Sequence, residues 1–105
     1  MSVWFTVLLV NNGMYGTIRM HQERHFPGRV HATELMNPAF DALAQAYGCF
    51  GERISRTADF AAAFERASAA NRDGQPALLE LMIDPQAITA NQTLDEIRQQ
   101  ALGAK

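Results

Sequence analysis

Apolar residues form two short continuous runs in this chain and recur at helical spacing elsewhere. The run "VWFTVLLV" spans residues 3–10, and "ALLELMID", at residues 77–84, is of similarly strong apolar character. Continuous rather than alternating apolar character is typical of a strand covered on both faces within a parallel sheet. The pattern therefore predicts buried parallel strands at both places.

Two helices are predicted between the first strand and the middle of the chain. A short helix over residues 15–23 is followed by a loop at 25–36, which contains a proline and a glycine. Asn37 before Pro38 favours a helix start, because asparagine caps free amides and proline at the first helical position gives up no hydrogen bond. Apolar residues then recur at helical spacing: Phe40, Leu43, Ala44 and Tyr47. Gly48 supplies a left-handed stop.

The second half of the chain predicts a strand and two more helices. The segment "CFGERIS" at 49–55 indicates a short strand near a sheet edge. A helix begins at Thr57, and its apolar face is expected in the core: Phe60, Ala63, Phe64 and Ala67. Thr93 and Glu96 form a capping box for a terminal helix over residues 94–102.

The order of elements is strand, helix, helix, strand, helix, strand, helix. Such alternation predicts an α/β fold, here a partial open parallel sheet with helices on both faces. No composition shift or repeat divides the chain, so residues 1–105 are expected to form one partial domain.

Composition excludes several classes of function. The chain has 105 residues, a hydrophobic content of 48% and a net charge of −2, as expected for a small globular protein without a nucleic-acid-binding footprint. A single cysteine, Cys49, excludes an internal disulfide and a cysteine-based zinc site, and is interpreted as core filler. No run is long enough to span a membrane, and residues 1–10 lack the features of a secretory signal. A cytoplasmic location is therefore expected.

The stretch "LLVNNGMYGTIRMHQ", residues 8–22, allows two interpretations. Asn12-Gly13 is a strong signal for a two-residue hairpin turn, and residues 17–21 alternate as a returning strand would. Alternatively, the two asparagines end a buried strand of an open sheet, and ligands bind beyond the carboxyl ends of such strands. An amide oxygen with a nearby backbone carbonyl would suit Mg²⁺, which usually also takes a carboxylate. The buried character of the incoming run favours the ligand site.

The chain resembles the C-terminal cofactor domain of thiamine-diphosphate-dependent enzymes of the acetolactate synthase, benzoylformate decarboxylase and pyruvate decarboxylase type. The resemblance is carried by "LLVNNGMYGTIRMHQERHFPGRV", "NPAFDALAQAYG" and "PALLELMIDP". It implies that Asn12 gives its side-chain oxygen, and Met14 its backbone carbonyl, to Mg²⁺. It also implies that Gly13, Tyr15 and Gly16 lie along the cofactor diphosphate, as the positive end of a helix favours.

The chain also departs from that family's pattern. The metal-binding Gly-Asp-Gly that precedes the double asparagine in the family is absent, since ten residues precede Asn11. The glutamate that activates the cofactor, in a separate domain of such enzymes, is absent too. We therefore expect a C-terminal segment that is inactive alone, in which Asn11 braces the turn rather than contacting metal.

The predicted function is that of a segment of a decarboxylase or carboligase, a lyase or transferase acting on 2-keto acids. Its expected partners are the remaining domains or subunits of the parent enzyme, in a homo-oligomer. The alternative is a non-catalytic α/β module, or a subunit that completes a site with another chain. A third possibility is a metal-binding protein that uses His21 and His25, whose spacing of four places both on one helix face.

The other polar residues suggest ordinary roles. His21, His25 and His31 are interpreted as surface side chains that could face a substrate. Two groups of charged residues are interpreted as solvated helix faces: Glu23 with Arg24, and Asp95 with Glu96 and Arg98. Asp84-Pro85 is interpreted as a turn after the last strand.

Overall fold

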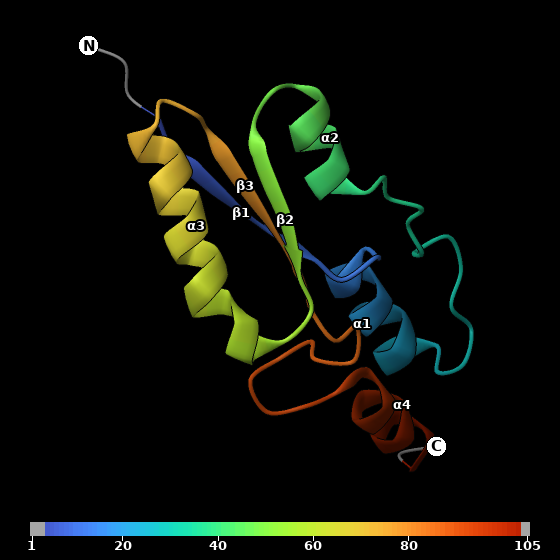
Figure 1. The fold of residues 1–105 in the computed structure, drawn as a ribbon. Coiled ribbons are helices and arrows are strands. Elements are labelled where there is room, and N and C mark those ends of the chain that lie inside the picture. The colour runs from blue at the N-terminus through green and yellow to red at the C-terminus, as the bar shows by residue number, and fades with distance from the viewer. Residues whose placement is uncertain (1–3, 104–105) are drawn as a thin grey trace. The chain divides into compact units, whose positions relative to one another are not determined.

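The computed structural model describes residues 4–103 and contains a three-stranded parallel sheet in the order β1-β3-β2 (Figure 1). The predicted order of elements and the α/β class are confirmed. The elements in chain order are β1 (Thr6–Asn11), α1 (Gly16–His25), α2 (Phe40–Ala46), β2 (Phe50–Ile54), the 3₁₀ turn η1 (Thr57–Asp59), α3 (Phe60–Arg72), β3 (Ala77–Met82) and α4 (Leu94–Gly103).

The described residues form two compact units. One comprises the residues up to Asn11 together with Asn37–Met82, and therefore the sheet, α2 and α3. The other comprises Asn12–Met36 and the residues from Ile83 onward, and therefore α1 and α4. The single partial domain predicted from the sequence stays a prediction.

The register of the sheet decides which side chains share a face. Leu78 of β3 pairs with Val7 of β1 and with Gly51 of β2, all in parallel. The neighbouring β3 residue, Leu79, points to the opposite face because side chains alternate along a strand. Since Leu79 packs with α3 and Gly51 lies against α2, the two helices cover opposite faces of the sheet.

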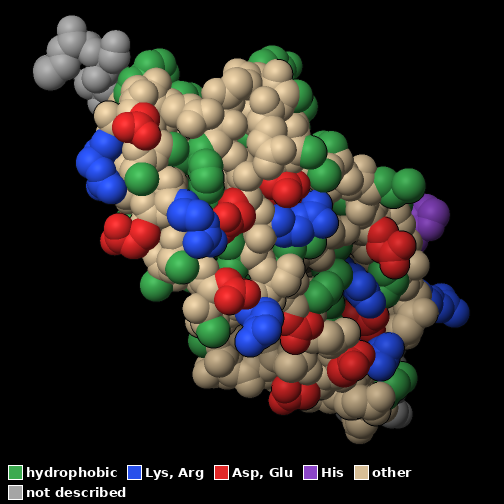
Figure 2. Space-filling view, in the orientation of Figure 1, with side chains coloured by type: hydrophobic (Ala, Val, Ile, Leu, Met, Phe, Trp, Pro, Cys, Tyr) green, Lys and Arg blue, Asp and Glu red, His purple; other side chains and the backbone are tan. Residues whose placement is uncertain are grey.

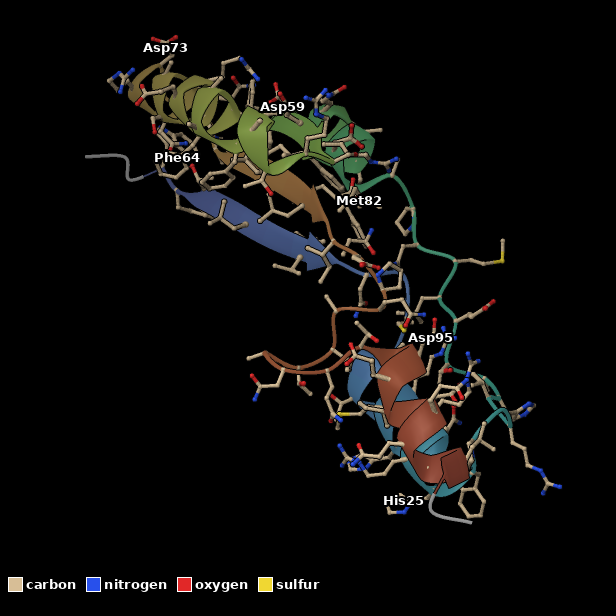
Figure 3. All side chains as sticks on the ribbon, turned by 90° about the horizontal axis from the view of Figure 1, so that it is seen from below. His25, Asp59, Phe64, Asp73, Met82 and Asp95 are labelled. Atoms are coloured by element: carbon tan, nitrogen blue, oxygen red, sulfur yellow. The ribbon has the colours of Figure 1, made fainter. Side chains whose placement is uncertain are left out.

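Small side chains let α3 approach the sheet closely. A buried cluster joins α3 to β2 and β3: Ile54, Ala63, Ala67, Ala77 and Leu79. Three partly buried residues pack against this cluster: Phe50, Phe60 and Leu81. Phe64, labelled on α3 in Figure 3, is 43% exposed. The prediction that it belongs to the core is wrong: the alanines, one turn apart, occupy the inward stripe, and Phe64 lies at its margin.

The first strand is less buried than its sequence predicts. Val10 is 60% exposed and Leu8 is 46% exposed, although the strand pairs fully with β3. The reason is position: β1 is at an edge of the described sheet, so only β3 lies beside it. The strand begins at Thr6, while Val3, which the prediction included, lies outside the described residues. β2 is at the other edge, as predicted.

The start of α2 differs from the prediction. The helix begins at Phe40, with Ala39 in the capping position and no side-chain cap. Asn37 does not cap it; its amide instead donates a hydrogen bond to Asn11 Oδ1 at 3.0 Å. The predicted stop is confirmed, since Gly48 has φ +80°, a conformation that favours glycine.

In the second unit, the capping box of α4 is confirmed in both directions. The Glu96 amide donates to Thr93 Oγ1 at 3.1 Å, and the Thr93 amide donates to Glu96 Oε1 at 3.2 Å. Leu94 and Ile97 are the buried residues of α4. The helix packs on α1, and the shared surface includes Ile97 and Arg24.

The surface carries mixed charge. On the face shown in Figure 2, basic and acidic side chains lie among one another without a large patch of one sign. No helix within residues 4–103 has the length and apolar character to cross a membrane.

Candidate functional site

The stretch after β1 turns directly into a helix. Residues 16–25 are α1 and β1 pairs in parallel with β3, so the hairpin interpretation of Asn12-Gly13 is wrong. Gly13 has φ +72°, and a Cβ added there would meet nothing within 4 Å. Glycine is thus required by backbone conformation rather than by crowding.

Asn12 and Met14 are held against each other within this turn. The Met14 amide donates a hydrogen bond to Asn12 Oδ1 at 3.2 Å. This bond occupies one of the two lone pairs of that oxygen and fixes its direction. The second lone pair of Asn12 Oδ1 is left to bind a ligand.

A short antiparallel bridge orients the Met14 backbone. The Tyr15 amide donates to the Thr33 carbonyl and the Leu35 amide donates to the Gly13 carbonyl, both at 2.8 Å. These bonds flank Met14, so its own carbonyl points away from the facing segment. No donor to that carbonyl is found within residues 4–103.

Gly16 is where the helix meets the Asn12 side chain. A Cβ at Gly16 would lie 2.9 Å from Asn12 Nδ2 and 2.9 Å from Ile88 Cδ1. Both distances are shorter than ordinary contacts between heavy atoms. Only glycine at this position leaves the Asn12 amide where it is.

The N-terminus of α1 is open. Tyr15 occupies the capping position without a side-chain hydrogen bond, and the first turn contains no acidic residue. The amides of Gly16, Thr17 and Ile18 find no acceptor among the described residues. They border a cavity of about 340 Å³, which is also lined by Met14 and Tyr15. The positive end of a helix with free amides is a natural site for an anion such as a diphosphate.

The five residues predicted as cofactor-binding therefore lie together in one turn: Asn12, Gly13, Met14, Tyr15 and Gly16. Their chemistry fits a diphosphate and offers two neutral oxygens to a cation. No group of three His, Cys, Asp or Glu side chains that could hold a metal ion is found within the described range.

Comparison with known protein families identifies the family to which the chain belongs. Residues 2–81 match the family described as thiamine pyrophosphate enzyme, C-terminal TPP binding domain. The chain belongs to this family. The resemblance to the thiamine-diphosphate-dependent enzymes is confirmed at this level, and the chain is a thiamine-diphosphate-binding segment of such an enzyme. The match covers β1 to β3 except for Met82, the last residue of β3, and α4 lies beyond it.

A buried carboxylate in this thiamine-diphosphate-binding domain was not singled out from the sequence. Glu80 of β3 is fully buried and accepts hydrogen bonds from Asn11 Nδ2 at 2.8 Å, the Asp41 amide at 3.3 Å and Arg53 Nε at 3.2 Å. Burial raises the pKa of Glu80, but the bonds from Asn11, Asp41 and Arg53 outweigh it, so the pKa is lowered. A lone glutamate in the middle of an apolar strand is the signal that could have found it.

Glu80 also explains the role of Asn11, the first of the two adjacent asparagines. Asn11 is 7% exposed and is held by Glu80 on its amide nitrogen and by Asn37 on its oxygen. These bonds attach the end of β1 to β3 and to the segment before α2. The two adjacent asparagines thus have different surroundings.

The remaining candidates fall into ordinary roles, with one exception. The rings of His21 and His25 stack on one face of α1 with centroids 6.0 Å apart, and Figure 3 shows His25 at the end of that helix. Asp84 Oδ1 accepts from the Gln86 amide at 2.9 Å, as expected for a turn. Glu23 is the exception: it is 2% exposed and accepts from the Gly28 amide, so its prediction as a solvated residue is wrong. Its carboxylate holds the loop that follows α1.

Two further predictions concern single residues. Cys49 is a free, half-buried thiol at an apolar cavity and is not part of the buried core, so its interpretation as core filler is wrong. Asp95 is exposed and pairs with Arg98 on the same helix, at 2.8 Å. That pair is a solvated helix face, as predicted.

Proposed function

We propose that this chain supplies part of the Mg²⁺-diphosphate site of a decarboxylase or carboligase that acts on 2-keto acids. The observation that carries the proposal is the open N-terminus of α1, directly behind the Asn12–Gly16 turn. Free amides without an acidic neighbour favour an anion with several oxygens. A diphosphate is such an anion, and it is part of the cofactor that the family binds.

Asn12 and Met14 are the residues proposed to hold the metal. The Asn12 side-chain oxygen has one lone pair in use, and the Met14 carbonyl has no described donor. Two neutral oxygens are a weak site for Mg²⁺, which is usually bound through carboxylates and substrate phosphates. The carboxylate is therefore proposed to come from another segment, domain or subunit of the parent enzyme.

The residues present indicate which role the protein has and which role the cofactor has. When bound, thiamine diphosphate supplies stabilisation of the charge that develops as a bond next to the keto group breaks. The turn contributes position: Gly13 provides the left-handed backbone, Gly16 leaves room for Asn12, and the α1 amides hold the diphosphate. No described side chain at the turn is placed to transfer a proton, so this segment is proposed to anchor rather than to catalyse.

The partners are proposed to be the remaining domains or subunits of that enzyme, in a homo-oligomer. Leu8 and Val10 of β1 are 46% and 60% exposed, although the strand carries an uninterrupted apolar sequence. An exposed apolar strand at a sheet edge favours pairing with further chain. Light scattering of the 105-residue chain is expected to report association; a monomer at every concentration would contradict this.

Calorimetric titration of the chain with thiamine diphosphate, with and without Mg²⁺, tests the proposal. Weak binding that strengthens with Mg²⁺ is expected. Asn12→Ala should lower the affinity about tenfold or more, because it removes a metal ligand. Met14→Leu should change it little, because only the Met14 carbonyl is used.

Three outcomes would contradict the proposal. If Asn12→Ala bound the Mg²⁺ complex as well as the unaltered chain, the asparagine would not be a ligand. If Met14→Leu were as damaging as Asn12→Ala, the role given to the carbonyl would be wrong. Tight binding with full activity by the chain alone would overturn the need for another segment.

A further inference from the structure

The guanidinium of Arg19 on α1 is underpaired. Its Nε is buried and has no hydrogen-bond partner. Its Nη1 lies 3.9 Å from the Met14 sulfur, a weak acceptor. No carboxylate within residues 4–103 forms an ion pair with it. The five donors of this cation therefore have one weak acceptor among the described residues.

A cavity borders this guanidinium. It has a volume of about 490 Å³ and is lined by Arg19 and by the segment Val30–Glu34. Sites for small ligands are typically of about this size. Because Nε is closed off from solvent, the terminal N–H groups are the donors that a ligand in the cavity would meet.

The wall of the cavity opposite Arg19 is held in a defined conformation. Gln22 brackets it, donating to the His31 carbonyl at 2.9 Å and accepting from the His31 amide at 3.4 Å. Thr33 is 2% exposed, and its hydroxyl also bonds to Gln22. Ala32, between His31 and Thr33, has φ +57°, which is uncommon for a residue with a side chain. Backbone strain of this kind clusters at ligand sites.

The charge of the lining disfavours a dianion. Arg19 contributes one positive charge and Glu34 one negative charge to the same cavity. A phosphate dianion would leave this lining overcharged, whereas a single carboxylate can pair with the guanidinium through two parallel hydrogen bonds. Met14 connects the cavity with the cofactor turn, since its sulfur contacts Arg19 and the residue also lines the cavity at the start of α1.

We propose that Arg19 binds a carboxylate group in this cavity, and that the ligand is the 2-keto acid substrate. The identity of the ligand rests on the proposed function, whereas the presence of an anion site does not. Arg19 would thus hold the substrate by its carboxylate, next to the Met14 side chain. It would act by binding and orientation.

Nuclear magnetic resonance of the chain tests this without cofactor or Mg²⁺. Burial shields the Arg19 Nε–H from exchange, so its resonance serves as the reporter. Pyruvate is expected to move this resonance in a saturable manner, and neutral pyruvamide is expected to leave it in place. Arg19→Gln should raise the dissociation constant for pyruvate at least about tenfold, because it removes the charged donors.

Matched variants separate the site from the general effect of charge. Arg24→Gln removes the same charge from an exposed position on the same helix and should leave the pyruvate affinity within about twofold. Arg19→Lys keeps the charge but not the planar pair of donors, so its affinity should fall between those of Arg and Gln.

Four results would overturn the proposal. These are a resonance unmoved by pyruvate, an equal response to pyruvamide, an equal loss in Arg24→Gln, and a stronger response to inorganic phosphate than to pyruvate. Each can occur while thiamine diphosphate still binds at Asn12. Conversely, loss of cofactor binding with pyruvate binding intact would reject the cofactor site alone.

Discussion

The side-chain amide of Asn11 donates a hydrogen bond of 2.8 Å to the carboxylate of Glu80, across two neighbouring strands. The bond is buried, and Glu80 is completely enclosed. Because the Asp41 amide and Arg53 bind the same carboxylate, one side chain joins β1, β2 and the start of α2. The first unit thus has a polar centre next to its alanine-rich core.

Glu80→Ala should destabilise the chain strongly. It would leave the buried Asn11 amide without its acceptor, which typically costs about 1–3 kcal/mol, and it would remove the partner of Arg53, whose side chain is 42% exposed. Urea denaturation followed by circular dichroism would measure the change. Glu65→Ala, at an exposed position on α3, is the control and should change stability by less than about 0.5 kcal/mol. Similar losses in both variants would reject the role of the network.

The stability of the chain should fall on acidification through the Glu80 carboxyl. Its pKa is lowered in the folded state, so on acidification the unfolded chain takes up the proton first. The stabilisation is thus complete above the unfolded pKa of about 4.3 and is lost as the pH falls through the folded pKa. Glu80→Gln, measured by urea denaturation at several pH values, should show a flatter profile below about pH 5. A profile as steep as that of the unaltered chain would contradict this.

Gly16→Ala should cost less than about 1 kcal/mol, because its Cβ would lie 2.9 Å from Asn12 Nδ2 and Ile88 Cδ1, and both atoms are at the ends of side chains that can move. It should also weaken binding of the Mg²⁺ complex of thiamine diphosphate by displacing Asn12. Gly103→Ala is the matched control, since a Cβ there meets nothing within 4 Å. Thermal unfolding and cofactor titration would measure both effects. Equal cofactor affinity of the Gly16→Ala and Gly103→Ala variants would contradict the displacement of Asn12.

Thr93→Ala should destabilise the chain by about 1 kcal/mol through loss of the α4 cap. Glu96→Ala breaks the reciprocal bond, so the two changes share one interaction. The double variant should therefore lose less stability than the two single changes added together. Full additivity in chemical denaturation would mean that the two bonds act independently.

The sequence predicted most elements because their signals are local. Continuous apolar runs, the glycine at position 48 and the Thr93–Glu96 box act within a few residues, and all three reappear in the structure. The start of α2 was missed because Asn37 bonds to Asn11 rather than to its own helix, a choice made by tertiary structure. The capping preference of asparagine is a local property, so it does not show that Asn11 competes with the helix for the Asn37 side chain.

The candidate site was predicted only where chain neighbours form it. The turn at 12–16 is one continuous segment, so its residues could be named together from the sequence. Glu80 and Arg19 were missed because their surroundings come from distant segments: Glu80 meets Asn11 across the sheet, and Arg19 faces the residues around Thr33. A charged side chain at the surface usually has no structural role, whereas a buried one has a structural or binding role. Burial depends on the whole fold, so a local sequence pattern does not show it.

The parallel pairing of β1 with β3 has a consequence for how the chain folds. Val7 pairs with Leu78, whereas the β2–β3 pairing joins Gly51 to the same residue over a much shorter loop. Contacts between distant segments are slow to form because a long loop must close first. During synthesis, β1 leaves the ribosome long before its described partner exists. We expect β2, α3 and β3 to form the folding nucleus and β1 to join last, so slow refolding should report on the first strand.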